Sequence, residues 1–194
     1  SEYSQQPTVF YHADCLDGYG AAWATWRSLG DKAHYQAVRH HIPMPNFAQG
    51  SILYILDFCY PMEQLIRAAK KASKIIVLDH HISAQQAFKA YQADLPANLE
   101  MHFNMQQSGC MMAWHYFQGD VESPMLLRHI EDHDLWRHQL EHTEELMKAL
   151  FVRRPIAFAA FEYIPLDTLY REGKILLRQH RQILQTLFHP RHSI

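Results

Sequence analysis

Short apolar runs that end directly in aspartate or histidine are the feature that most limits what this chain can fold into. There are three of them: residues 9–11 precede His12, residues 52–56 precede Asp57, and residues 75–78 precede Asp79-His80-His81. Strands buried on both faces of a parallel sheet have short, continuous apolar sequences. Open sheets of that kind bind ligands just beyond the carboxyl ends of their strands. The runs therefore predict parallel strands whose ends share one polar site.

The segments between these runs have helical patterns. Gly30 ends the helix predicted after the first run, Pro61 starts one after the second, and Ser83 caps one after the third. A further strand at residues 99–103 precedes Ser108, which caps a helix rich in methionine and aromatic residues. Strands that alternate with helices predict an α/β fold, with a doubly wound, mostly parallel five-stranded sheet and helices on both faces.

The second part of the chain has a different character, because helical patterns dominate from Ser123 onward. These patterns cover residues 125–133, 141–151 and 166–188. We therefore expect an α/β domain at residues 1–137, followed by a C-terminal helical extension at residues 138–194 that leads toward a second domain.

Composition narrows the functional classes. Lysine and arginine total 18 against 20 aspartates and glutamates in 194 residues, so the chain lacks the basic field that attracts long nucleic acids. Three cysteines are too few for a disulfide framework and indicate a reducing compartment, so we expect a cytoplasmic protein. No apolar stretch approaches the roughly 18 residues of a membrane span, so we expect no membrane partner. The 15 histidines are the one compositional anomaly.

The residues after the first run have a spacing that suits metal ligation. In His12-x-Asp14-x-x-Asp17-Gly18, the side chains of His12 and Asp14 share one side of an extended chain. Asp17 then begins a helix, where the dipole favours an acid and the glycine tolerates a close backbone approach. The segment therefore offers one imidazole and two carboxylates as candidate ligands.

Asp57, His80 and Asp132 extend this candidate metal site. Asp57 follows the neighbouring strand and is placed to bridge two metal ions. His80 and Asp132 are placed to complete the site of the second ion. Mixed imidazole and carboxylate ligands suit Mn²⁺, with Fe²⁺, Co²⁺ and Zn²⁺ as alternatives, better than Mg²⁺. The sequence therefore predicts a centre that holds two divalent ions.

Two other interpretations concern the cysteines and an anion site. Cys15, Cys59 and Cys110 each lie beside a polar cluster, so a thiol-centred zinc or redox site is an alternative, although no Cys-x-x-Cys spacing occurs. Ser108-Gly109 precedes a helix and is a candidate to bind a substrate phosphate through backbone N–H groups. A plain helix cap at Ser108 is the simpler interpretation.

In their order along the chain, these clusters resemble the four motifs of the DHH phosphoesterase superfamily. Residues 12–18 resemble the first motif, Asp57 the second and Asp79-His80-His81 the third. Asp132, within residues 130–136, lies where the fourth motif's aspartate is expected, and Asp134 in the same segment is the alternative. The resemblance covers about residues 8–137 and implies the superfamily's N-terminal domain.

The resemblance also implies a manganese-type centre with two ions and assigns its residues. One ion would be bound by His12, Asp14 and Asp57, and the other by Asp17, Asp57, His80 and Asp132. His81 would act on the substrate phosphate as a catalytic group. Asp79 would support catalysis by orienting His80 or the end of its strand.

The first motif departs from the pattern of most members, His-x-Asp-x-Asp-Gly. One extra residue separates Asp14 from Asp17, although a subgroup with His-x-x-Cys-x-Asp-Gly has similar spacing. Either Asp17 reaches the ion alone while Asp14 faces solvent, or the loop bulges so that both reach it. The superfamily's usual second domain carries a substrate-binding motif rich in glycine and histidine, and no such motif follows residue 137. We therefore expect either a chain cut after a linking helix or a short form.

The expected function is metal-dependent hydrolysis of a phosphoester or phosphoanhydride bond, in a small nucleotide or a short oligonucleotide. A homodimer is an assembly compatible with these features. Two alternatives stay open. One is a non-catalytic regulatory domain that senses nucleotide or metal through a degenerate first motif, and the other is a thiol-dependent protein.

Overall fold

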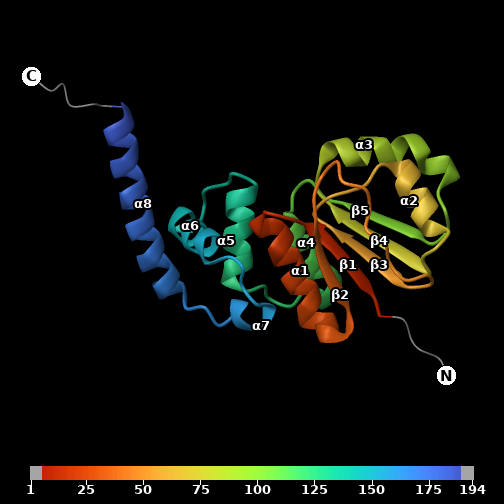
Figure 1. The fold of residues 1–194 in the computed structure, drawn as a ribbon, viewed down its shortest axis with the longest axis horizontal. Helices are drawn as coiled ribbons and strands as arrows, with labels where there is room; N and C mark the ends of the chain where they lie inside the picture. The colour runs from red at the N-terminus through yellow and green to blue at the C-terminus, as the bar shows by residue number, and fades with distance from the viewer. Residues whose placement is uncertain (1–5, 189–194) are drawn as a thin grey trace, which may run out of the picture. The chain divides into compact units, whose positions relative to one another are not determined.

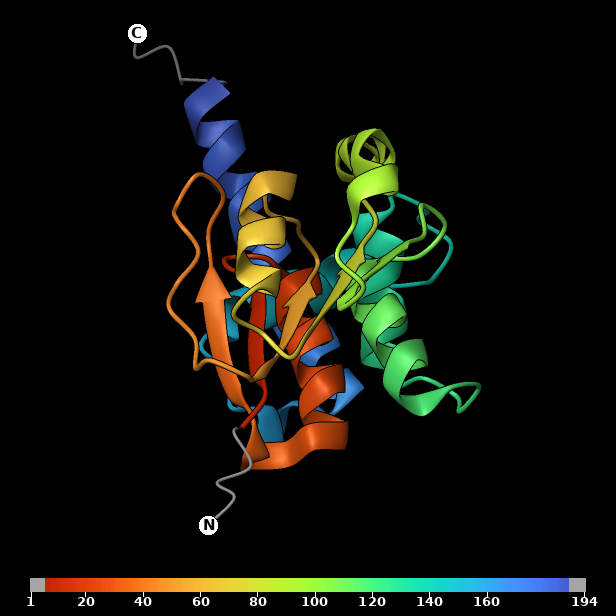
Figure 2. The ribbon, with the colours of Figure 1, turned by 90° about the vertical axis from the view of Figure 1, so that its right-hand side faces the viewer.

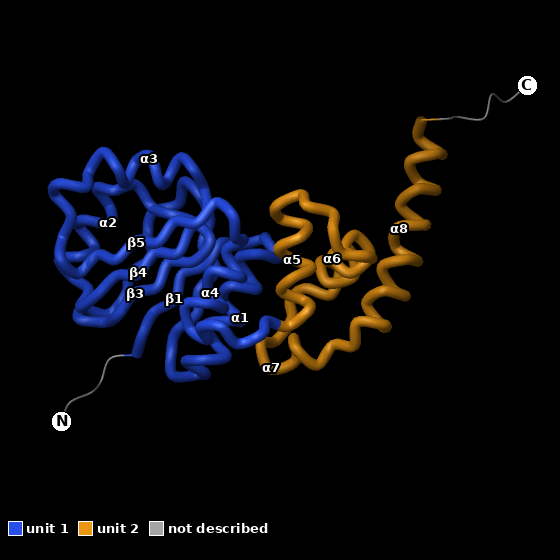
Figure 3. Tube along the Cα trace, turned by 180° about the vertical axis from the view of Figure 1, so that it is seen from behind, with its two compact units in different colours: residues 1–123 blue, residues 124–194 orange. Residues whose placement is uncertain are grey.

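The computed structural model describes residues 6–188, which fold into two compact units. A sheet unit extends to Ser123 and a helical unit begins at Pro124, drawn in blue and orange in Figure 3. The sequence-based division lies later, after residue 137. The compact units divide earlier because helix α5 (Met125–Asp134) packs against helix α6 (Thr143–Arg153).

The sheet unit is built on five parallel strands. In chain order they are β1 (Thr8–His12), β2 (His34–Val38), β3 (Ile52–Leu56), β4 (Lys74–Asp79) and β5 (Leu99–Phe103). In space the order is β2-β1-β3-β4-β5, and every neighbouring pair is parallel. From β1 the chain moves toward one edge of the sheet, and from β3 it moves toward the other, so the direction reverses between β1 and β3.

Two helices pack side by side on one face of the sheet (Figures 1 and 2). They are α1 (Leu16–Leu29) and α4 (Gly109–Gln118), and the rings of Trp23 and Trp114 stack between them with centroids 6.1 Å apart. A short 3₁₀ turn at Gly30–Lys32 follows α1 and leads into β2. Helix α4 also contacts β4, so this layer holds the start of α4 against the strand ends.

Helices α2 (Met62–Ala69) and α3 (Ile82–Tyr91) cover the opposite face, and a second 3₁₀ turn at Gln92–Asp94 follows α3. The core beneath α2 is apolar and fully buried, with Leu53 and Leu65 among its members. Apolar contacts on both faces explain the continuous apolar runs of the strands. The structure therefore confirms the predicted doubly wound α/β fold.

The crossover from β2 to β3 has no helix, although it passes β1 on the way. Residues 39–51 form a loop, and its Met44 and Phe47 pack against the same core as α2. Because Val38 pairs in register with His12, this loop starts at the carboxyl ends of the strands.

The helical unit consists of α5, α6, α7 (Phe158–Phe161) and α8 (Leu166–Phe188). Leu146 and Leu150 of α6 and Leu169 of α8 are buried, and α6 and α8 contact each other closely. This arrangement confirms the predicted helical character of the C-terminal part. Within residues 6–188, no helix combines the length and apolar character needed to cross a membrane.

Candidate metal centre

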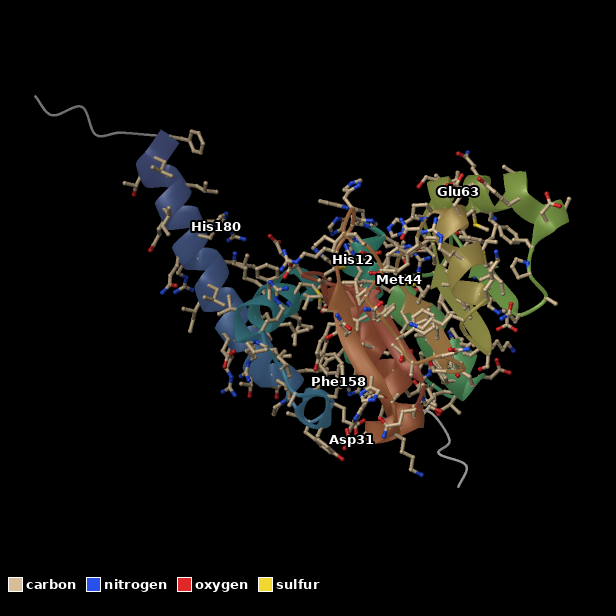
Figure 4. All side chains as sticks on the ribbon, turned by 45° about the vertical axis from the view of Figure 1, so that its right-hand side comes forward. His12, Asp31, Met44, Glu63, Phe158 and His180 are labelled. Carbon is tan, nitrogen blue, oxygen red and sulfur yellow. The ribbon has the colours of Figure 1, made fainter. Side chains whose placement is uncertain are left out.

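Three of the predicted site residues lie at the carboxyl ends of neighbouring strands. His12 is the last residue of β1, Asp57 follows β3 directly, and Asp79 is the last residue of β4. Figure 4 shows His12 at the end of the sheet opposite to Asp31, which lies in the 3₁₀ turn before β2. The direction in which the chain adds strands reverses between β1 and β3, and sheets of this kind bind ligands beyond the carboxyl ends of the strands at such a point. The sequence motifs lie at this same edge of the sheet.

Asp57 lies at the centre of the cluster and is 2% exposed. Its φ of +65° is left-handed, a conformation that aspartate adopts more readily than most residues. Its Oδ1 atom lies 2.9 Å from Nε2 of His80, and its Oδ2 atom lies 3.7 Å from Nδ1 of His12. The two carboxylate oxygens therefore face different imidazoles, as a bridging carboxylate between two ions would.

Asp17, in the first turn of α1, is held by the start of α4. The backbone N–H groups of Gly109 and Cys110 donate to its two oxygens, each over 2.8 Å. Its Oδ2 atom also lies 3.3 Å from Nε2 of His80. Because a helix N-terminus favours negative charge, α4 supports the Asp17 carboxylate in its buried position.

Ser108 and Gly109, for which a role in binding substrate phosphate stays a prediction, have partners within the chain. The N–H group of Gly109 is already used by Asp17, and the fully buried Ser108 accepts from the backbone of Met111 as a helix cap. Gly109 has another role, because a Cβ atom there would lie 2.6 Å from Oδ1 of Asp57. The anion at this helix terminus is therefore one of the chain's own carboxylates.

Cys15 is a member of the cluster that the motif resemblance does not assign as a ligand. It is the N-cap residue of α1, and its Sγ lies 3.7 Å from Oδ2 of Asp57. The candidate ligand atoms of His12, Cys15 and Asp57 all lie within 4.8 Å of one another. Gly18 allows α1 to start this close to β1, because a Cβ atom there would meet the backbone of His12.

Asp14 does not join the cluster, contrary to the ligand set implied by the resemblance. Its φ is +58°, its side chain is 62% exposed, and its Oδ2 lies 2.9 Å from Nη2 of Arg39. The left-handed turn after the strand directs the carboxylate toward the end of β2 instead. Of the two arrangements that the extra residue allows, the structure has the one in which Asp17 reaches the cluster and Asp14 faces solvent.

Asp79 fixes the two residues that follow it. Its Oδ1 accepts from the backbone N–H of His80 over 2.8 Å and lies 2.6 Å from Nδ1 of His81. The expectation was that Asp79 orients His80 or the strand end, whereas its side-chain partner is the imidazole of His81. That hydrogen bond raises the pKa of His81, whose side chain is 48% exposed, and leaves Nε2 as the nitrogen for substrate.

The charges of the cluster suit a cation. Burial raises the pKa of Asp17, and the charge of Asp57 raises it further. Burial alone would raise the pKa of Asp57, but hydrogen bonds with His12 and His80 outweigh burial and lower it. Burial opposes the charged form of His80, yet both carboxylates raise its pKa to about 10. In the metal-free protein His80 therefore supplies positive charge beside the carboxylates, and a metal ion would displace its proton.

Asp132 lies in α5 of the helical unit and is buried. Its Oδ1 accepts from the N–H of Gln139 over 2.8 Å, while Oδ2 accepts from the N–H of Leu140 and the hydroxyl of Thr143. The Thr143 hydroxyl also lies 2.7 Å from Nδ1 of His129. These bonds hold the loop between α5 and α6. The implied role of Asp132 as a metal ligand stays a prediction, which would require its oxygens to be shared with these donors.

A cavity of about 720 Å³ lies beside the cluster, and Asp79 and His81 form part of its wall. The other walls come from the start of the 39–51 loop, from the segment after β3 and from α3. Phe58, Tyr60 and Met62 give it an apolar side. These three residues form no motif in the sequence, and only their position shortly after Asp57 connects them to the site.

Comparison with known proteins agrees with the motif resemblance. Residues 8–150 match the N-terminal domain of the DHH family. An uncharacterised protein of Acanthamoeba polyphaga mimivirus is 29% identical over 158 residues, which cover 74% of this chain and 36% of the viral protein. The chain thus spans about a third of the length of this relative. No solved structure matches the chain. The family match covers most of the chain and includes the strand-end cluster, so the chain belongs to the DHH family, a metal-dependent family of phosphoesterase type.

Proposed function

We propose that this chain hydrolyses a phosphoester or phosphoanhydride bond in a small nucleotide or short oligonucleotide, with the help of two divalent metal ions. The observation that carries the proposal is the position of Asp57, whose oxygens face His80 at 2.9 Å and His12 at 3.7 Å. A buried carboxylate with one oxygen toward each histidine suits a pair of ions on its two sides. Membership of a metal-dependent phosphoesterase family supports the same chemistry.

The residues divide into two ligand groups that share Asp57. Asp17, Asp57 and His80 would hold one ion, for which their carboxylate and imidazole groups make Mn²⁺ the best candidate. His12 and Asp57 would hold the other. When bound, a pair of divalent ions supplies an activated water molecule and neutralises charge on the phosphate oxygens. The N-terminus of α4 keeps Asp17 in place through its two N–H donors.

His81 is the residue to which we assign proton transfer. Its Nδ1 is fixed by Asp79 at 2.6 Å, and this contact raises its pKa, so the protonated form is favoured. The remaining nitrogen, Nε2, is then oriented to donate a proton to the leaving oxygen of a phosphoester. His81 also lines the cavity beside the cluster, which is where a substrate would enter.

The cavity supports a small substrate. Its volume of about 720 Å³ is in the usual range of small-molecule sites, roughly 300–1,000 Å³. Phe58 and Tyr60 are buried in the core, and together they give the cavity an apolar aromatic wall beside which a base can lie. The ring of His40 lies 4.9 Å from that of His12 and 6.2 Å from that of Phe58, so it connects the apolar wall with the cluster. A nucleotide could thus place its base on this wall and its phosphate at the cluster.

The test compares chelator-stripped protein with protein reloaded with Mn²⁺, using bis(p-nitrophenyl) phosphate and a diadenylate as substrates. We expect hydrolysis only after reloading, and two ions per chain. Asp57→Asn should lose both bound metal and hydrolysis. The exposed Asp94 lies outside the cluster, so Asp94→Asn should keep both. Fully metal-loaded protein that cleaves neither substrate would contradict the proposal.

A second candidate is a non-catalytic domain that senses nucleotide or metal. The exposed position of Asp14, paired with Arg39, favours it because the first motif then supplies one carboxylate fewer to the cluster. Nucleotide binding by protein that holds one ion or none, without turnover, would identify this function. Two bound ions with turnover would exclude it.

A further inference from the structure

We propose that Cys15 takes the place of Asp14 as a ligand of the ion beside His12, so that sulfur, nitrogen and oxygen together bind this ion. The proposal rests on the proposed function, because it assigns a further ligand of the same centre. It implies that this half of the centre selects a thiophilic ion such as Zn²⁺, Co²⁺ or Fe²⁺ over Mn²⁺.

The distances between the three ligand atoms carry this assignment. Oδ2 of Asp57 lies 3.7 Å from Sγ of Cys15 and 3.7 Å from Nδ1 of His12. Around a tetrahedral ion with a metal–sulfur bond of about 2.3 Å and metal–nitrogen or metal–oxygen bonds of about 2.1 Å, ligand atoms are roughly 3.4–3.6 Å apart. The two separations from Asp57 differ from these values by only a few tenths of an ångström, and the candidate ligand atoms of Cys15 and His12 lie within 4.8 Å of each other. One ion therefore fits between the three side chains with small side-chain movements.

Asp14 is in no position to serve instead. Its carboxylate is largely exposed and forms an ion pair with Arg39 over 2.9 Å. Moving the Asp14 carboxylate into the cluster would require its left-handed backbone to change, and with it the N-cap of α1 at the next residue, Cys15. Cys15 needs no such change, because its Sγ already lies within reach of Asp57.

Burial and the charge of Asp57 raise the pKa of Cys15 to about 12, so a metal ion would have to displace the thiol proton of Cys15. Cys15 is the N-cap residue of a helix of 14 residues, and its side chain makes no capping hydrogen bond to that helix. A helix N-terminus stabilises negative charge, which is the reason reactive and metal-binding cysteines often lie there.

The two halves of the centre then differ chemically. Asp17, Asp57 and His80 offer oxygen and nitrogen atoms, which suit Mn²⁺. His12, Cys15 and Asp57 add a soft sulfur atom, which binds Zn²⁺ more tightly than Mn²⁺. We therefore expect mixed occupancy when Zn²⁺ and Mn²⁺ are offered together, with Zn²⁺ in the half that contains sulfur.

Cobalt absorption tests the ligand directly. Chelator-stripped full chain is titrated with Co²⁺, and the near-ultraviolet band that arises from sulfur-to-cobalt charge transfer is recorded. We expect the band in the unaltered protein, in Asp14→Asn and in Cys59→Ser, and its loss in Cys15→Ser. Cys59 is the matched control, since it is another half-buried thiol near the cluster that is absent from the group of three. Stoichiometric cobalt binding without the band in the unaltered protein would overturn the proposal.

Cys15→Asp provides a second, independent measurement that does not depend on sulfur absorption. It supplies a carboxylate at the same position, so both ions should still bind while the preference changes. Loss of a group that merely supports a ligand typically weakens metal binding about 10–100-fold, so replacing the ligand itself should lower the preference for Zn²⁺ over Mn²⁺ by at least about tenfold. An unchanged preference would count against Cys15 as a ligand.

The two proposals fail in different ways. A sulfur-to-cobalt band in protein that hydrolyses no phosphoester would leave the Cys15 assignment standing and remove the proposed function. Hydrolysis by protein that binds two cobalt ions without the band would remove the Cys15 assignment and leave the proposed function standing.

Discussion

Asp17 and Asp57 share a single histidine nitrogen. Nε2 of His80 lies 3.3 Å from Oδ2 of Asp17 and 2.9 Å from Oδ1 of Asp57, and both carboxylates are at most 2% exposed. One imidazolium therefore faces two buried carboxylates. Buried charges of like sign are costly unless they are compensated, and a divalent cation would provide that compensation.

Metal binding should stabilise the fold for this reason. At a Mn²⁺ concentration of 100 times the Kd, the free energy of unfolding should rise by about 2.7 kcal/mol. Thermal melting of chelator-stripped protein across a Mn²⁺ titration measures the effect. Asp57→Asn removes the shared ligand and should show little increase. An equal increase in this variant would mean that the stabilising ion binds elsewhere.

The metal-free protein should lose stability at alkaline pH because of His80. The carboxylates raise its pKa from 6.5 to about 10, so folding favours its protonated form. This contribution is fully present below pH 6.5 and is lost as pH rises through about 10. Urea melts of stripped protein across this range should show the decline.

Two variants identify the source of that pH dependence. His80→Gln should flatten the decline, whereas His34→Gln, at an exposed position of β2, should leave it unchanged. Because the ion displaces the His80 proton, Mn²⁺ should also bind more tightly as pH rises toward 10. Affinity that is independent of pH would contradict the assignment of His80 as a ligand.

Gly109→Ala should damage the metal centre more than the fold. The added Cβ would lie 2.6 Å from Oδ1 of Asp57, so the Asp57 side chain must shift and its 2.9 Å contact with His80 is disturbed. We expect metal affinity to fall at least about tenfold, as for the loss of a supporting group. Isothermal titration with Mn²⁺ measures this change.

Gly30→Ala is the contrasting control for that experiment. Gly30 has a φ of +59°, but its Cβ would meet nothing within 4 Å. Gly30→Ala should therefore lower the free energy of unfolding by about 1–3 kcal/mol through backbone strain and leave metal affinity unchanged. Similar effects of the two variants on metal binding would show that the contact with Asp57 does not matter.

His81→Asn should lower kcat by roughly 10²–10⁴-fold, the usual contribution of a positioned acid or base. Bound metal, measured by elemental analysis, should stay near the level of the unaltered protein.

Asp79→Asn should lower kcat less than His81→Asn does, and it should also change the pH–rate profile. Its loss removes the hydrogen bond that raises the pKa of His81, so the alkaline limb of the pH–rate profile should move to lower pH. An unmoved limb would argue against His81 as the acid.

Asp132→Ala should destabilise the helical unit. It leaves the N–H groups of Gln139 and Leu140 and the Thr143 hydroxyl without their acceptor, at an expected cost of about 2–4 kcal/mol in the free energy of unfolding. Urea unfolding measures this loss, and Glu144→Gln, at an exposed position of α6, is the control. A variant that keeps its stability but loses one bound ion would instead support the ligand role implied by the motif resemblance.

Local sequence predicts the central strands well, because each is an apolar run buried on both faces. β2 was missed, since its side chains are mostly exposed and residues such as His34 and Gln36 give it no apolar run. The loop at residues 39–51 likewise has no helical pattern that would mark it as a crossover. Edge elements depend on tertiary pairing, which a local pattern does not encode.

The site shows the same limit. His12, Asp17, Asp57 and His80 were predicted together because strand ends meet at one edge of a parallel sheet. The use of the α4 N-terminus by Asp17 was missed, because its partner Gly109 is 92 residues away in sequence. The exclusion of Asp14 depends on a left-handed turn, which no residue of the motif requires.

The crossover between β2 and β3 has no helix, and it places the candidate metal ligands and one wall of the cavity on different parts of the fold. The candidate ligands lie on strand ends and helix starts, whereas one wall of the cavity, including His40, belongs to the crossover loop. Lengthening a surface loop adds little entropic penalty, about 0.6 kcal/mol for each doubling. Insertions and replacements in this loop can therefore reshape the cavity while the candidate ligands keep their positions. Proteins with the same metal ligands could differ in this way in the molecules that their cavities accept.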